Sequence, residues 1–338
     1  MSGVNFKFKA LENIGVSHRQ PVGNTVPIAS AVPLRNPTDP RSFERIKPGS
    51  GTIELEVMDY VKDTKTLRPL LILSPIDFPY PPSIAFCEMM KRNGFRVIYI
   101  RRLGFGGTPA LPRQLLTESN VKGGAAIMAE VAVIMRAIAM MDLEDVVLLG
   151  VSSANPVCYR LCQTCPAIGF TVFSHPTFNQ DTFEAVRPIW IQPVARQIVL
   201  TKLGFKLAAR GLRFKIKRNA LSFYDDFYAK SAADLKYRLA NEKDFLAAAT
   251  FVEQIAPETL YYEVFHTLAE DPFLRDGLFL NVPSVVLAGS ETTTHWLASA
   301  EAEANRLKVP FVKAPRGGIL TAYASPDSLL QVINTQAT

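Results

Sequence analysis

Short apolar runs alternate with helix-like segments along most of this 338-residue chain. Several runs are apolar throughout, which is typical of strands buried on both faces of a parallel sheet. Strands are expected at residues 52–61, 67–74, 95–102, 145–150, 168–175, 284–290 and 309–314, and helices at 83–94, 123–141, 153–165 and 325–335. Strands that alternate with helices build a doubly wound sheet. The alternation therefore predicts an α/β fold with a mostly parallel sheet.

The alternation is interrupted once, between residues 183 and 278, where the chain is mostly helical and rich in basic and aromatic residues. A helical insertion between two strands of a sheet is the layout of a cap. We therefore predict a core formed by residues 49–182 and 279–338, with a helical cap at 183–278. Residues 1–48 are rich in Pro, Asn, Arg and Ser and weakly periodic, so we predict an irregular N-terminal extension.

The strand at 145–150 runs directly into Gly150-Val151-Ser152-Ser153-Ala154 and then into a helix. This is the strand–turn–helix context of the G-x-S-x-G nucleophile elbow, with Ala154 in place of the last glycine. The N-terminus of the following helix adds positive potential, which favours an oxyanion or another anionic group. A tight turn of small residues without chemistry is the alternative, and the position after a buried strand argues against it. Ser152 is therefore the candidate nucleophile.

With this turn in place, residues from about 51 to 335 resemble the α/β-hydrolase family. Gly94-Phe95-Arg96-Val97 and the stretch from Arg102 to Thr108 look like the family's strand and loop motif G-[FY]-x-V…R-G-[FY]-G-x-S. The resemblance implies an α/β-hydrolase fold with a helical cap insertion. It also implies hydrolysis of small esters or amides, provided that the other catalytic groups are present.

The family's oxyanion loop corresponds to residues 74–78, which read Ser-Pro-Ile-Asp-Phe here and lack the usual His-Gly. By position, the backbone N–H groups of Ile76 and Ser153 would stabilise an oxyanion. Asp77 lies in the same loop and is a candidate ligand-binding residue.

The resemblance fails at the general base. A serine hydrolase needs an imidazole that takes the serine proton and returns it to the leaving group. The family places this histidine after the last strand, and Ile319 stands at that position here. Glu291 lies near the position of the family's acid, one residue early. His295 and His175 both follow strands, so either is a candidate for a non-standard base.

Gly317 to Pro326 resembles the corresponding segment of histidine-less α/β-hydrolase domains that are fused to LuxR-class transcription regulators, and Pro81-Pro82 fits the same subgroup. Those domains are thought to sense small ligands. The resemblance extends only to the sensor-like half, because the chain carries no DNA-binding motif.

Two functions follow. The leading hypothesis is a protein with a degenerate triad that binds a small apolar or acyl-type ligand in a capped pocket, as a sensor or partner module. The alternative is an active serine hydrolase that uses Ser152 with a non-standard base. Neither hypothesis requires a cofactor or a metal ion. We expect no nucleic-acid partner, although the net charge is +6.

The segment 201–223 interleaves basic and apolar residues. It is predicted to be a solvated cap helix, and weak contact with an anionic membrane or a protein is the alternative. Cys158, Cys162 and Cys165 share the spacing of an iron–sulfur motif but lie on one face of a predicted helix, so we expect buried thiols. No export signal is recognisable, and the thiols favour a cytoplasmic location.

Overall fold

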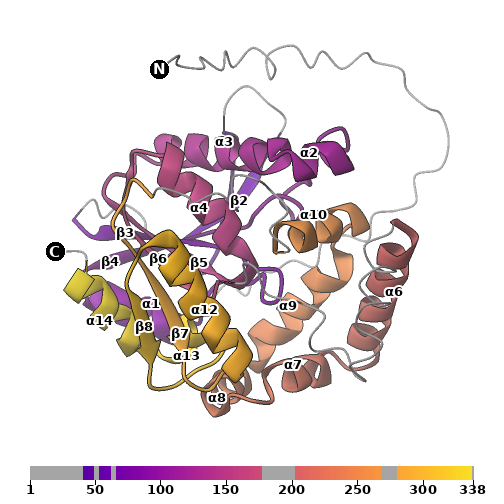
Figure 1. Ribbon diagram of the computed structural model, residues 1–338. Coiled ribbons are helices and arrows are strands. Elements are labelled where there is room, and N and C mark those ends of the chain that lie inside the picture. Colours follow the sequence, from indigo (N-terminus) through magenta and orange to yellow (C-terminus); the bar gives the residue numbers. More distant parts are fainter. Residues whose placement is uncertain (1–40, 49–52, 62–65, 177–201, 268–279, 337–338) are drawn as a thin grey trace. The chain divides into compact units, whose positions relative to one another are not determined.

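A computed structural model describes residues 41–48, 53–61, 66–176, 202–267 and 280–336 (Figure 1). Its centre is an eight-stranded sheet with the order β1-β2-β4-β3-β5-β6-β7-β8. The strands are β1 (Phe43–Ile46), β2 (Leu55–Asp59), β3 (Arg68–Leu73), β4 (Phe95–Ile100), β5 (Val146–Val151), β6 (Ile168–Ser174), β7 (Ser284–Gly289) and β8 (Phe311–Ala314). β1, β2 and β4 pair antiparallel, and all other pairs are parallel. The predicted mostly parallel, doubly wound sheet is confirmed.

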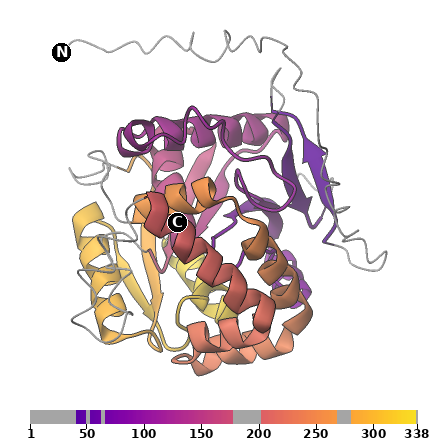
Figure 2. The ribbon, with the colours of Figure 1, turned by 90° about the vertical axis from the view of Figure 1, so that its right-hand side faces the viewer.

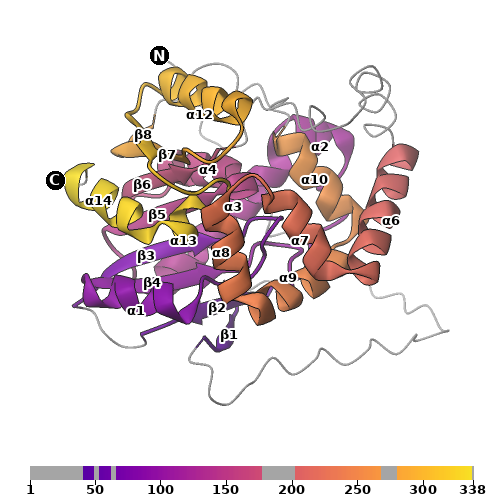
Figure 3. The same cartoon turned by 90° about the horizontal axis from the view of Figure 1, so that it is seen from below.

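Helices cover both faces of this sheet. Alternate strand residues such as Leu71 and Leu148 pack in one core cluster with α3, α4 and α12. Their neighbours, such as Leu70 and Val147, pack in a second cluster with α1 and α14. Figure 3 shows α1 and α12 on opposite sides of the sheet. The core helices are α1 (Ile84–Arg92), α2 (Glu118–Lys122), α3 (Ala125–Met140), the short turn η1 (Ser152–Ala154), α4 (Asn155–Thr164), α12 (Thr294–Leu307), α13 (Thr321–Ala324) and α14 (Pro326–Gln336).

Within the described residues, five helices lie between β6 and β7 in the sequence, in the segment predicted to be a cap, and we call them the cap helices. They are α6 (Lys202–Arg218), α7 (Ala220–Tyr228), α8 (Ala232–Ala240), α9 (Glu242–Gln254) and α10 (Pro257–Thr267). In Figure 2 these reddish-orange helices gather in front of the sheet. Buried aromatic residues of α7 and α9, among them Tyr224, Tyr228 and Phe245, belong to the second core cluster. The apolar side of the cap therefore packs on the core and shares its hydrophobic stabilisation.

The predicted N-terminal extension differs from the structure at its end. Residues 1–40 lie outside the described ranges, but Phe43–Ile46 form the edge strand β1 and not irregular chain. Arg45 and Lys47 pair with Glu54 across this edge. The described helices include none with the length and hydrophobicity that a bilayer crossing requires.

Candidate active site

Ser152 occupies a strained turn between β5 and α4. Its φ is +48°, a left-handed conformation that is uncommon for residues other than glycine. Asn155 locks the turn, because its side-chain amide donates to the carbonyl of Ser152 at 2.7 Å and to that of Ser174 at 3.2 Å. A side chain at Gly150 would lie 2.5 Å from Asn155 Oδ1 and 2.8 Å from Cys158 Sγ. The small residues of the motif therefore allow the close approach of strand and helix on which the elbow depends.

The predicted oxyanion donor Ile76 is already bonded inside the protein. Its backbone N–H donates to Ser153 Oγ at 2.8 Å. An oxyanion hole works when its donors point at the position that the developing negative charge will occupy. Here a hydroxyl of the elbow itself takes one donor, so the donor pair expected from the sequence is incomplete while Ser153 keeps this position.

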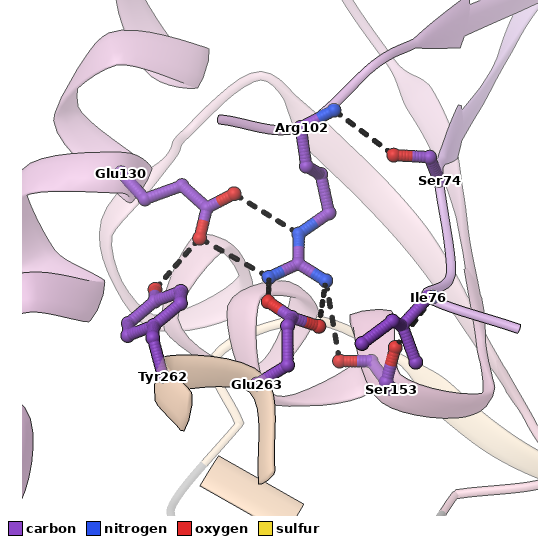
Figure 4. A network of polar contacts seen from close by, with 7 residues as sticks. All are labelled: Ser74, Ile76, Arg102, Glu130, Ser153, Tyr262 and Glu263. Carbon is purple, nitrogen blue, oxygen red and sulfur yellow. Dashed lines mark hydrogen bonds and ion pairs between the residues drawn. The ribbon is translucent and has the colours of Figure 1, made fainter. Parts of the chain in front are cut away.

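Behind Ser153 lies a buried ionic network around Arg102 (Figure 4). Its guanidinium donates from Nε to Glu130 Oε1 at 3.0 Å and from Nη1 to Glu263 Oε2 at 2.9 Å, and it also reaches the carbonyl of Ser153 at 3.3 Å. The hydroxyl of Tyr262 donates to Glu130 at 2.7 Å. The network joins β4, α3, the elbow and the cap helix α10.

The network holds two carboxylates against one guanidinium. Burial alone would lower the pKa of Arg102, but Glu130 and Glu263 raise it well above its ordinary value, so the guanidinium stays charged. Burial raises the pKa of Glu263, and its interactions with Arg102 and the Ser153 hydroxyl oppose that rise. Every charge in the network thus has an opposite charge or a hydroxyl beside it, as buried ions require.

Ser152 faces a different group, the carboxyl of Asp77. Burial raises the pKa of Asp77 to about 6, and the hydroxyls of Ser152 and Tyr228 oppose this rise. Tyr228 donates to Asp77 Oδ2 at 3.4 Å, while Oδ1 has no partner of good hydrogen-bond geometry among the described residues. The ligand-binding role that the sequence suggested for Asp77 stays a prediction.

Tyrosine hydroxyls from three elements lie within the electrostatic influence of Asp77. Its charge raises the pKa of the phenols of Tyr99 on β4, Tyr224 and Tyr228 on α7, and Tyr323 on α13, in each case after the larger effect of burial. Within the described part of the chain, the buried hydroxyls of Tyr224 and Tyr323 have no hydrogen-bond partner, and that of Tyr99 has Ser74 beside it but no hydrogen bond of good geometry. Buried polar atoms normally have a hydrogen-bond partner, so each of these hydroxyls is free to bond to a ligand or a water molecule.

Ile319 is buried against the second core cluster, at the position where the sequence resemblance expects a histidine. The residues on both sides of it are bound by a cap carboxylate. Gly318 N–H donates to Asp234 Oδ1 at 3.0 Å and Leu320 N–H to Asp234 Oδ2 at 3.2 Å. Burial raises the pKa of Asp234, and these two hydrogen bonds oppose that rise. The loop is therefore held to the cap helix α8 by its backbone.

His175 directly follows β6 and is fully buried. Burial lowers its pKa to about 4, so the ring is neutral at pH 7. Nε2 lies 3.0 Å from Thr292 Oγ1, and the ring packs edge-on against Trp296 at a centroid distance of 5.6 Å. Its contacts are with the loop and helix after β7, and no hydrogen bond joins it to Ser152 in the described residues.

Glu291 and His295 lie at the cap–core boundary. Glu291 Oε2 accepts hydrogen bonds from Ser231 Oγ and from the Ala233 N–H, both at 2.8 Å, which cap the start of α8. Burial would raise the pKa of Glu291, but these hydrogen bonds lower it. His295 is exposed on the first turn of α12. Glu291 therefore holds the cap, and its described hydrogen bonds lead to no histidine.

A cavity of about 340 Å³ lies between α7, α8 and the loops after β7 and β8. Ser152 is absent from its lining, but Tyr228, whose hydroxyl bonds Asp77, forms part of the wall. The lining residues are Asp226, Phe227, Tyr228, Ala229, Lys230, Ser231, Asp234, Glu291, Thr292, Thr293, His295, Trp296, Gly318 and Ile319. His295, Glu291 and Ile319 thus meet at one cavity, while His175 lies behind it against Thr292.

Two other sequence predictions can be placed. The three thiols on and after α4 are buried, and no disulfide joins them. Among the described residues, no group of His, Cys, Asp and Glu side chains is arranged to hold a metal ion. In the basic segment, Lys215 pairs with Asp226 and Lys217 with Glu253. Contact of this segment with a membrane or a protein stays a prediction.

Asp234 and three members of the Arg102 network, Glu130, Tyr262 and Glu263, were not predicted as site residues from the sequence. A signal for Asp234 is present, because Ser231-x-x-Asp234 resembles a capping box at a helix start. Ser231 is the N-cap of α8, and its hydroxyl accepts the Asp234 N–H at 3.1 Å. No local signal marks Glu263, which meets Arg102 from a helix far along the chain.

Comparisons with known proteins support the fold. No family model matches the chain, and no match is found among curated proteins. Solved structures do match. A bromoperoxidase from Bacillus anthracis is 16% identical with a TM-score of 0.55, covering 87% of this chain and 98% of its own. An esterase from Thermogutta terrifontis is 18% identical with a TM-score of 0.56, covering 87% and 97%.

An enol-lactonase from Burkholderia xenovorans is 12% identical with a TM-score of 0.53, covering 83% of this chain and 95% of its own. With the strand order and the elbow, these likenesses establish the α/β-hydrolase fold that the sequence predicted. They give no support to the finer resemblance to sensor domains of LuxR-class regulators.

Proposed function

We propose that this chain binds a small ligand with a largely apolar body in the cavity between cap and core, and that it lacks Ser–His–acid hydrolysis. The observation that carries the proposal is the loop around Ile319. An isoleucine cannot accept a proton, and Asp234 fixes the backbone on both sides of it. Binding without turnover is what a ligand sensor or a partner-binding module requires.

Two further observations support this function. The Ile76 N–H, one of the expected oxyanion donors, is bonded to Ser153. His175 is neutral and bonded to Thr292, and His295 is exposed beside the cavity, whose lining excludes Ser152. Removing any one member of a catalytic triad lowers the rate by several orders of magnitude.

A fluorophosphonate probe tests the proposal directly, since it labels serines that are activated by a base. The full-length protein is expected to stay unlabelled at pH 7.5, like the Ser152→Ala variant, while an esterase in the same tube is labelled. Rapid stoichiometric labelling that disappears in Ser152→Ala would overturn the proposal.

The second candidate is an active hydrolase of small esters or amides. The specific observation in its favour is the strained Ser152 beside Asp77, whose pKa of about 6 suits a proton acceptor near neutral pH. Ser152 Oγ would attack the carbonyl carbon and pass its proton to the Asp77 carboxylate. That proton would leave with the alcohol or amine, and water would then hydrolyse the acyl-enzyme.

Hydrolysis of p-nitrophenyl acetate distinguishes the two candidates. The second candidate predicts turnover that Ser152→Ala abolishes and that Asp77→Asn also abolishes, while loss in a His175 or His295 variant would identify an imidazole base. Turnover that persists in Ser152→Ala would exclude this serine as the nucleophile.

A further inference from the structure

Three carboxylates follow one another from the elbow to the cavity. After burial, the charge of Asp234 raises the pKa of Asp77, and that of Glu291 raises the pKa of Asp234. The groups that dominate these two pKa values include no basic side chain. At half-buried Glu291 a cation takes part, because Arg316 lowers the pKa of this carboxyl. Among the described residues, the hydrogen bonds to the Asp77 and Asp234 carboxylates come from a phenol hydroxyl and from backbone N–H groups, and from no basic side chain.

This acidic region contrasts with the chain as a whole, which carries a net charge of +6. Elsewhere in the interior, carboxylates have cations beside them. Asp244 is bonded to Arg41 at 2.6 Å, and Glu263 is paired with Arg102. A buried carboxylate without a cation is costly, and an incoming cation would remove that cost. Asp77 is therefore the place where a positively charged ligand gains most.

The unpaired hydroxyls around Asp77 point to a ligand independently of charge. In the described residues the hydroxyls of Tyr224 and Tyr323 have no partner, and neither Tyr99 nor Asp77 Oδ1 has one of good hydrogen-bond geometry. All four residues are at least nine-tenths buried. A group with several N–H donors, such as a primary ammonium, satisfies a carboxylate oxygen and phenol oxygens together.

The cavity supplies the matching surface for the rest of such a ligand. Phe227, Tyr228 and Trp296 present aromatic rings, and Ile319 adds an aliphatic side. Aromatic rings attract cations electrostatically. The basic lining residue Lys230 is exposed. Tyr228 belongs both to the cavity wall and to the hydroxyls around Asp77, so it connects the two parts of the site.

We propose that the cavity takes a small lipophilic amine, with its ammonium group directed past Tyr228 toward Asp77 and its apolar body between the cap aromatics and Ile319. This inference rests on the proposed function, because it assigns the ligand class of the same cavity. The preference comes from the carboxylate and the orphaned phenols, and the aromatic walls favour a ring in the ligand's body.

Calorimetric titration of the full-length protein with benzylamine and with benzyl alcohol at pH 7.5 tests the inference. The two probes share ring and size and differ in the charged head group. Benzylamine is expected to bind at least about tenfold more tightly. Asp77→Asn is expected to reduce this ratio to near one. Glu144→Gln, which removes an exposed carboxylate before β5, is the matched control and should keep the preference.

Equal affinities, no binding of benzylamine at millimolar concentration, or an unchanged preference in Asp77→Asn would overturn the inference. A thermal melt of Asp77→Asn shows that the variant is folded before it is titrated. Fluorophosphonate labelling of the same samples reports separately on the proposed function. If the protein stays unlabelled and does not bind benzylamine, only the inference of an amine ligand is overturned.

Discussion

Ser152 and Ser153 are neighbours in the chain, but their side chains face opposite kinds of buried surroundings. Ser153 meets the Arg102 network, in which each carboxylate has a guanidinium beside it. Ser152 meets Asp77, whose carboxyl is bonded by the hydroxyl of Tyr228 and by no basic side chain among the described residues. The elbow thus lies between an ionic network whose carboxylates have a cation and a polar cluster around Asp77 whose described hydrogen bonds include none from a cation.

The difference bears on what each side does. A satisfied network fixes geometry, and here it ties the elbow to the cap through Glu263. A buried polar group without a hydrogen-bond partner lowers the stability of the folded protein. A ligand that bonds to this group removes the penalty. We therefore propose that the Arg102 side supports the structure and that the Asp77 side takes part in ligand binding.

The largest expected effect on stability comes from disrupting the Arg102 network. Arg102→Met leaves Glu130 and Glu263 buried without their cation, and loss of one partner of a buried pair typically costs about 3–5 kcal/mol. Urea denaturation should show a fall of that size in the free energy of unfolding, or the variant should fail to accumulate as folded protein. Arg45→Met, at an exposed edge where its carboxylates lie 3.8 Å away, is the control and should change stability by less than about 1 kcal/mol.

Removal of the buried charge on the other side, that of Asp77, should change stability in the opposite direction. Asp77 has a folded pKa of about 6 against an ordinary 3.8, so the folded state holds its proton more tightly than the unfolded state. Its ionisation therefore destabilises the protein progressively as pH rises from about 4 to 6, by about 3 kcal/mol in total. Asp77→Asn removes this penalty and should raise the free energy of unfolding by up to about 3 kcal/mol above pH 6.

The pH dependence separates this charge effect from a packing effect. The difference in unfolding free energy between Asp77→Asn and wild type should shrink as pH falls below 6 and vanish near pH 4. Taking the difference also removes the opposing contribution of His175, whose lowered pKa costs stability as pH falls from 6.5 toward 4. A stability difference between variant and wild type that does not change with pH would contradict a buried Asp77 carboxylate without a cation. A variant that is less stable than wild type above pH 6 would contradict it as well.

The fold and the elbow could be predicted because both depend on residues that are close together in the sequence. Short, fully apolar runs such as Val146–Val151 are typical of buried strands, and the small residues after that run allow a tight turn. The missing histidine was equally visible, since Ile319 is one position in one loop. The strand Phe43–Ile46 was missed because four alternating residues at a sheet edge carry too weak a pattern.

The surroundings of the two serines could not be predicted, because they are assembled from distant segments. Tyr99, Tyr224 and Tyr323 converge on Asp77 only after the cap and the C-terminal helices pack on the sheet. Glu263 and Asp234 likewise reach the core from the cap. Periodicity identifies such residues as buried or exposed, but it does not say which buried polar groups meet.

The smallest expected effect concerns the contact that divides the two sides. Ser153→Ala removes the acceptor of the Ile76 N–H and a hydroxyl next to Glu263, and a neutral hydrogen bond of this kind contributes about 1 kcal/mol. A double-mutant cycle with Glu263→Gln in urea denaturation should give a nonzero coupling, because both residues belong to one network. The variant also frees the Ile76 N–H as an oxyanion donor, yet it should stay unlabelled by the fluorophosphonate probe. Labelling that appears in Ser153→Ala alone would mean that Ser153, and not the absent imidazole at position 319, keeps Ser152 silent.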